Sequence, residues 1–121
     1  ESSVDRLTTM IQEVKPENLV LAHMGGWGQW NEVSSILEED YMKNVYLDTS
    51  SCIKKLNHNT SLPIEKFKKM VNIHGADHIL FGSDSPWDDQ KDAVDLIKEC
   101  GFSEKDTDAI LGKNAVTLLN L

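Results

Sequence analysis

The sequence has little of what would assign a protein to a specialised class. Its 121 residues include two cysteines, Cys52 and Cys100, which lie far apart and form neither a Cys-x-x-Cys pair nor a cysteine–histidine metal spacing. We therefore expect reduced thiols and a cytoplasmic protein. Basic residues are also scarce, with 12 lysines and arginines against 20 acidic residues. This imbalance disfavours nucleic acid and anionic membranes as partners, because both bind basic surfaces.

Long apolar runs are missing as well. No segment approaches the roughly 18–20 apolar residues of a membrane span, and no charged-then-apolar leader begins the chain, so we expect neither a membrane helix nor a secretory signal. Low-complexity stretches, linkers and tandem repeats are absent too. A chain of 121 residues with 40% hydrophobic content suffices for one compact domain.

Short apolar segments and helical patterns alternate along the chain. Apolar residues at helical spacing, with Pro63 at a first turn and Gly75 and Gly101 as stop signals, predict helices. A possible capping box begins at Ser103. The predicted helices cover 3–14, 28–42, 63–74, about 89–100 and a last segment from 103, interrupted at Gly112. The predicted strands cover 19–23, 44–49 and 78–83.

The order and spacing of these elements predict an α/β fold with a parallel sheet covered by helices. About 25–33 residues separate consecutive strands, which is the length of a βαβ unit. Strands that are apolar throughout and separated by helices are typical of parallel sheets. We expect residues 1–121 to form a single domain of this kind.

Each predicted strand ends in a polar residue that could take part in catalysis: His23, Asp48 and Asp84. Ligands of parallel α/β folds bind beyond the carboxyl ends of the strands. His23 could be a core histidine, yet Gly25 and Gly26 would let backbone approach a ligand. A histidine here can serve as a general base or a metal ligand.

The two aspartates leave alternatives open. Asp84 follows Gly82 and could be an oxygen ligand of a divalent metal or the cap of a turn. For Asp48 we favour a structural role, holding its loop through side-chain hydrogen bonds to backbone.

Aromatic and histidine side chains elsewhere divide between core and site. Trp27 and Trp87 lie on strand-end loops and, with Ser51, could line a substrate site, whereas Trp30 lies on the apolar face of a helix and favours the core. We expect a solvated His58 and structural roles for His74 and His78, at the opposite rim of the sheet.

Four segments together resemble the carboxyl-terminal part of the amidohydrolase-2 family, in this order: LVLAHMGG, NVYLDTSS, HILFGSDSPW and AILGKNAVTLLNL. These enzymes are TIM-barrel metal-dependent hydrolases, and the family includes decarboxylases of the aminocarboxymuconate-semialdehyde type. The resemblance implies three βα units that correspond to barrel strands six to eight and the closing helix. By position, His23 resembles a histidine that acts on substrate or touches metal, and Asp84 resembles a metal-ligating aspartate.

Departures from the family pattern matter as much. A full barrel needs about 250 residues, and this chain has 121. The His-x-His of the first strand and the histidine of the fifth are missing. His23 and Asp84 alone cannot form a zinc site, which needs three protein ligands and water. We therefore expect an inactive portion of a hydrolase or decarboxylase, with zinc bound only in the complete enzyme.

An incomplete barrel also predicts self-association. We expect barrel-facing Leu19, Leu21 and Leu80 to lose their cover and the edge strands to stay open, which favours a homo-oligomer. Two other readings remain: a stand-alone α/β module that binds Mg²⁺ or phosphate through Asp48 and Asp84, and a non-catalytic interaction domain.

Overall fold

The computed structural model describes residues 3–14, 19–25, 30–50, 62–82 and 90–120. Three short parallel strands lie at the centre, in the order β1-β2-β3. The strands are β1 (Val20–Leu21), β2 (Tyr46–Asp48) and β3 (Ile79–Leu80). The parallel α/β fold predicted from the sequence is therefore confirmed.

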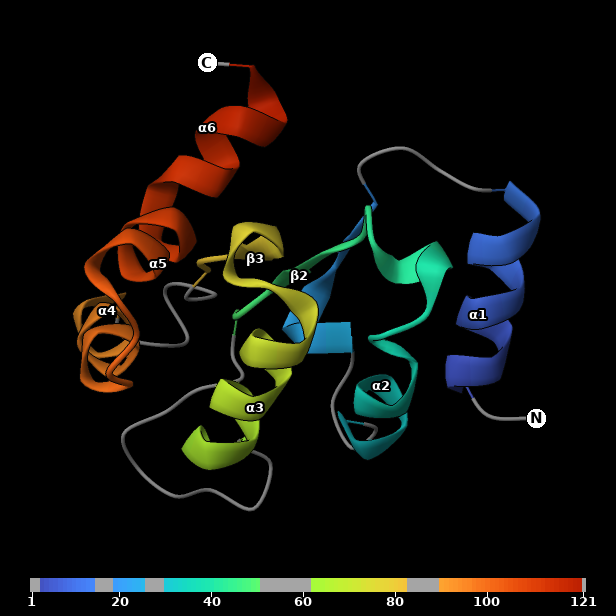
Figure 1. Ribbon diagram of the computed structural model, residues 1–121, viewed down its shortest axis with the longest axis horizontal. Coiled ribbons are helices and arrows are strands. Elements are labelled where there is room, and N and C mark those ends of the chain that lie inside the picture. Colours follow the sequence, from blue (N-terminus) through green and yellow to red (C-terminus); the bar gives the residue numbers. More distant parts are fainter. Residues whose placement is uncertain (1–2, 15–18, 26–29, 51–61, 83–89, 121) are drawn as a thin grey trace.

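Helices surround this sheet (Figure 1). Helices α1 and α2 lie on the β1 side, and α4, α5 and α6 on the β3 side. None of the helices in the described ranges is long and apolar enough to cross a membrane. The helices are α1 (Ser3–Val14), α2 (Trp30–Ile36), α3 (Ile64–His74), α4 (Gln90–Glu99), α5 (Glu104–Asp108) and α6 (Asn114–Leu119). Shorter helical turns are η1 (Ala22–Gly25), η2 (Asp40–Met42), η3 (Ala76–His78) and the π-helical η4 (Ala109–Lys113).

Several predicted helix ends are confirmed. Helix α3 follows Pro63 and ends at His74, and the next residue, Gly75, has φ +100°, a backbone conformation that favours glycine. The hydroxyl of Ser103 accepts a hydrogen bond from the Asp106 amide at 3.1 Å and so caps α5. The helix predicted over 28–42 is shorter, because α2 stops at Ile36 and the chain re-enters a helical turn only at η2.

The two faces of the sheet differ in cover. Leu21, Leu47 and Ile79 align across the three strands and are 9%, 0% and 0% exposed within the helix-covered core. The other face carries Val20, which is 39% exposed, Tyr46, which is buried beside His78, and Leu80, which is half-buried. The prediction that Leu21 would lose its cover is therefore wrong, because Leu21 is buried in the hydrophobic core.

The outer edge of β3 is covered by the carboxyl-terminal helices. The Thr49 amide donates to the Leu80 carbonyl at 2.9 Å, so Ile79 and Phe81 turn their backbone groups away from β2. The Phe81 amide donates to the Ile110 carbonyl of η4 at 3.1 Å, and the Asn114 side-chain amide donates to the Ile79 carbonyl at 2.7 Å. The expectation of an open edge is thus wrong at β3.

Candidate functional site

The described part of the candidate site lies where β1 and β2 end. His23 was expected at the end of a strand over 19–23, but β1 stops at Leu21 and His23 lies in the turn η1. Both His23 (φ 55°, ψ 41°) and Met24 (φ 53°, ψ 34°) have left-handed backbone, which costs roughly 1–2 kcal/mol per non-glycine residue. The strand alternation used to orient His23 therefore does not apply to it.

Hydrogen bonds on both sides hold this strained turn. The His23 amide donates to Oδ1 of Asp48 at 3.1 Å, and the indole Nε1–H of Trp30 donates to the His23 carbonyl at 3.0 Å. The side chain of Met24, the next residue of the turn, is fully buried in the core, and this packing holds Met24 in place. The surrounding structure thus determines the unusual backbone of η1, as strained functional positions require.

The imidazole of His23 is anchored to the segment that follows β2. Its Nδ1 lies 2.7 Å from the carbonyl oxygen of Ser50 and 3.4 Å from the Ser50 hydroxyl. Oδ1 of Asp48 accepts from the Ser50 amide at 3.0 Å and from the Ser50 hydroxyl at 2.5 Å. The structural role predicted for Asp48 is therefore confirmed.

β2 and β3 are tied together immediately beyond their ends. The Thr49 hydroxyl donates to the Gly82 carbonyl at 3.1 Å and accepts from the Gly82 amide at 3.0 Å. A Cβ at Gly82 would lie 3.2 Å from Cβ of Ser50, so a side chain there would crowd the residue that anchors His23. The segments after all three strands are thus linked.

Two of the predicted site residues lie in the described residues. These are His23, on the rim, and Gly25, which is buried against Val33 of α2 and has φ +96°. The need for glycine at Gly25 comes from that packing, and its contact with a substrate stays a prediction. The others lie outside the described residues: Gly26, Trp27, Ser51, Asp84 and Trp87.

Sequence reasoning missed Ser50 as part of this site. The available signal was its place two residues after Asp48, because an aspartate commonly accepts hydrogen bonds from backbone and hydroxyl groups two positions on. What the sequence could not give was the approach of His23 from a segment 27 positions earlier. Trp30, placed in the core from its helix face, is 9% exposed as predicted.

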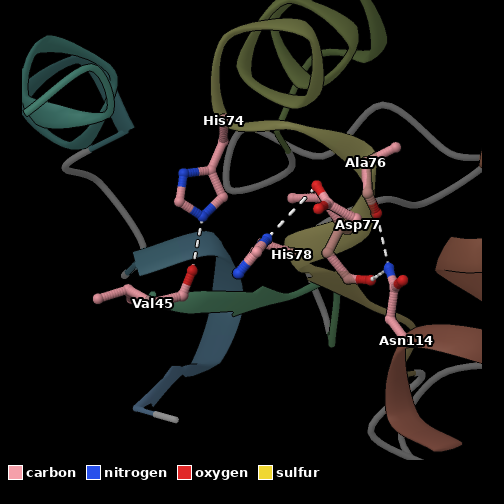
Figure 2. Close-up of polar contacts among 7 residues, drawn as sticks. Val45, His74, Ala76, Asp77, His78 and Asn114 are labelled. Atoms are coloured by element: carbon pink, nitrogen blue, oxygen red, sulfur yellow. Dashed lines mark hydrogen bonds and ion pairs between the residues drawn. The ribbon is translucent and has the colours of Figure 1, made fainter. Parts of the chain in front are cut away.

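A second polar cluster occupies the opposite rim of the sheet (Figure 2). The Nε2–H of His74 donates to the Val45 carbonyl at 2.6 Å. The His78 ring lies 5.9 Å from that of His74 and 4.7 Å from that of Tyr46, and its Nδ1 lies 3.4 Å from Asp77. These contacts join α3, η3 and β2, which supports the structural roles predicted for both histidines.

Burial lowers the pKa of His74 below its ordinary value of 6.5, although the bond to Val45 opposes this. The unfolded chain should thus bind a proton that the folded chain excludes, and the free energy of unfolding should decrease as pH falls through 6.5. Urea unfolding at about pH 7.5, 6.5 and 5.5 tests this, because these values span the ordinary pKa of histidine.

His74→Gln should make the free energy of unfolding depend less on pH. The same pH dependence in the wild type and in His74→Gln would contradict this role of His74.

Comparison with solved structures shows that this chain has the fold of part of a TIM barrel. An amidohydrolase from Burkholderia multivorans, solved with bound zinc, matches with a TM-score of 0.72 and 15% identity over 95% of this chain and 48% of its own. A dihydroxybenzoic acid decarboxylase from a Polaromonas species, solved with manganese and the inhibitor 2-nitroresorcinol, matches at 0.62 and 24% identity over 86% and 34%. A 5-carboxyvanillate decarboxylase from Sphingomonas paucimobilis matches at 0.66 and 16% identity, over 86% and 34%.

Likeness at these identities establishes the fold alone. The chain spans between a third and a half of the length of these enzymes, so it corresponds to part of their TIM barrels. Comparison with curated proteins gives no match. Comparison with protein families gives a match to the amidohydrolase family designated Amidohydro_2 over residues 16–121. Since this match covers most of the sequence, the chain belongs to the amidohydrolase-2 family.

Proposed function

We propose that this chain supplies the carboxyl-terminal part of the active site of a metal-dependent hydrolase that acts on a small carbonyl or carboxylate substrate. The observation that carries the proposal is the anchored imidazole of His23, which lies at the carboxyl end of β1 with Nδ1 engaged by Ser50. Active sites of barrel enzymes form at this rim. His23 would bind or polarise the substrate, or accept a proton from it.

The chain's donors fit part of a metal site. Among the described residues, no three histidine, cysteine or carboxylate side chains come together. His23 would supply one nitrogen ligand and Asp84 one carboxylate, whereas a catalytic zinc needs three protein ligands. A bound metal supplies a water whose pKa is lowered to about 7. We propose zinc as that metal, with its remaining ligands outside this sequence.

Decarboxylation is the second candidate reaction. Two of the three structural relatives named above are decarboxylases of hydroxylated aromatic acids, and one of these was solved with manganese. Both reactions would need His23 to be held at the carboxyl rim of the sheet, with one ring nitrogen directed to the substrate or the metal. We further propose that the chain associates with a second copy, which the exposure of Val20 at the edge strand β1 (39%) supports.

The test is the activity of the product of the whole reading frame that encodes this sequence. Decarboxylation of dihydroxybenzoates and hydrolysis of carboxylate lactones would be followed with zinc or manganese. We expect metal-dependent turnover, and His23→Ala should lower kcat/KM by about 100-fold or more, which is the usual loss of a general base.

The matched control is His78→Asn, at the opposite rim of the sheet, which should retain most of the activity. Equal losses in the two variants would show that histidine removal acts through folding and would contradict a catalytic His23. Turnover that resists chelation of the metal would contradict the metal-dependent class.

A further inference from the structure

We propose that Trp30 is a positioning residue: its indole N–H holds the His23 carbonyl, prevents β1 from continuing through the turn η1, and so sets how His23 is presented at the carboxyl rim. The use of this position by a substrate or a metal rests on the proposed function. The control of the His23 backbone by Trp30 does not, because it follows from contacts within this chain.

The conformation that η1 avoids is a longer strand β1. The Leu19 carbonyl faces β2, where it accepts a hydrogen bond from the Tyr46 amide at 2.8 Å. Alternate residues of a strand direct their backbone groups to the same neighbouring strand. A strand that continued through His23 would therefore direct both its N–H and its C=O to β2, and it would need no left-handed residue.

The observed backbone of His23 has its two polar groups on partners from different elements. Its amide donates to Oδ1 of Asp48, the last residue of β2, at 3.1 Å. Its carbonyl accepts from the Nε1–H of Trp30, the first residue of α2, at 3.0 Å. In a helical turn the N–H and C=O of a residue point in opposite directions along the axis. The left-handed backbone of His23 thus makes both bonds, and a continued strand would lose the bond to Trp30.

Trp30 can hold this carbonyl because its own place is fixed. The side chain is buried and belongs to the hydrophobic core. An indole N–H only donates, and a buried one usually has a hydrogen-bond partner. The turn also packs directly against α2, because a Cβ at Gly25 would lie 2.8 Å from a methyl group of Val33. The position of α2 is thereby transmitted to the backbone of His23.

A tryptophan that only filled the core would stabilise the fold without selecting the backbone of His23. Left-handed backbone is unfavourable at His23 and Met24, so the turn depends on the groups that hold it. Loss of the indole N–H should therefore favour the extended conformation and redirect the imidazole. The consequence for a catalytic group is large, because a misplacement of about 1 Å can cost on the order of 100-fold in rate.

The experiment is amide hydrogen exchange of the ¹⁵N-labelled chain, followed by NMR. Trp30→Phe keeps an aromatic ring in the core and removes the N–H. We expect the His23 amide to exchange about tenfold faster in this variant, relative to the Tyr46 amide of the same sheet, since one net hydrogen bond contributes up to about this factor. The backbone chemical shifts of His23 and Met24 should move from left-handed toward extended values.

Leu37→Ala is the matched control, because Leu37 is buried in the same core and its truncation leaves a comparable cavity without removing a hydrogen bond. The ratio of the His23 and Tyr46 exchange rates should stay as in the wild type. Equal ratios in Trp30→Phe and Leu37→Ala would overturn the proposal. If Trp30→Phe does not fold, exchange in the wild type decides: the indole N–H should be protected together with the His23 amide, and an indole that exchanges as freely as tryptophan in solution overturns the proposal.

The activity of the reading-frame product tests the positioning role itself. Trp30→Phe should lower kcat by about tenfold or more, because the reacting group is displaced, whereas Leu37→Ala should retain the kcat of the folded enzyme. An unchanged kcat in Trp30→Phe, despite faster exchange at His23, would overturn the positioning role. Absence of turnover in the wild-type product would overturn the proposed function alone, and the exchange rates would still decide whether Trp30 holds the His23 backbone.

Discussion

Replacing Asn114 with aspartate is expected to lower the free energy of unfolding by about 3–5 kcal/mol, since each buried polar group left unsatisfied costs about 1–3 kcal/mol and a buried charge costs more. The Asn114 side-chain amide donates to the Ala76 carbonyl at 2.6 Å and to the Ile79 carbonyl at 2.7 Å, and the residue is 6% exposed. Aspartate would face both carbonyls with oxygens that only accept (Figure 2). Urea unfolding followed by circular dichroism measures the loss.

Asn120→Asp is the matched control. It makes the same chemical change at an exposed residue that follows α6 with left-handed backbone, a conformation that aspartate tolerates. We expect this variant to stay within about 0.5 kcal/mol of the wild type. Equal effects of the two substitutions would contradict the role of Asn114 in joining η3 and the outer edge of β3 to the carboxyl-terminal helices.

The second large effect is expected from Gly25→Ala. The added Cβ would lie 2.8 Å and 2.9 Å from the two methyl groups of Val33, which is fully buried, and Gly25 has φ +96°. Overpacking costs about 1–3 kcal/mol and left-handed backbone roughly 1–2 kcal/mol, so we expect a loss of about 2–5 kcal/mol. Thermal and urea unfolding would measure it, and the turn that carries His23 would be displaced as well.

Two other glycines separate the causes. Gly101 has φ +79° and nothing within 4 Å of an added Cβ, so Gly101→Ala should show the backbone strain alone, about 1–2 kcal/mol. Gly112 lies in η4 with equal space and no positive φ, so Gly112→Ala should be neutral or stabilising by up to about 1 kcal/mol. If Gly25→Ala were no worse than Gly101→Ala, the close contact of Gly25 with α2 would not matter.

The elements that the sequence predicted well are those set by local signals. Pro63 and Gly75 mark the ends of α3, and the hydroxyl of Ser103 caps α5, because each acts on backbone within a few residues. The order of three parallel strands followed from apolar segments at βαβ spacing. The family followed from the segments around His23 and Asp84, and the match over residues 16–121 confirms it.

What the sequence could not predict depends on contacts between distant segments. The alternation of a strand places Leu21 and His23 on one face, but β1 ends at Leu21, and the left-handed backbone of His23 and Met24 changes the direction of the chain. Both residues are ordinary in sequence terms, and hydrogen bonds from Asp48 and Trp30 hold the turn. The left-handed conformation is thus a tertiary effect.

The π-helical turn η4 is a second example. Gly112 indicated an interruption of the last helix, and the structure has a π-helical turn there. The Ile110 carbonyl accepts a hydrogen bond from the Phe81 backbone amide, and the Asn114 backbone amide donates instead to the Ala109 carbonyl, five residues back. Residue Phe81, distant in sequence, thus occupies the carbonyl that Asn114 would use in an α-helix, and no local sequence pattern predicts this.

We have proposed that this chain supplies an incomplete part of a metal-dependent site. Zinc titration of the ¹⁵N-labelled chain, with His23→Ala as reference, tests it most directly. We predict that zinc shifts the His23 ring signals in the wild type, with an affinity far below that of sites with three protein ligands. A chain that binds zinc tightly at one equivalent, or one whose His23 does not respond to zinc, would contradict the account.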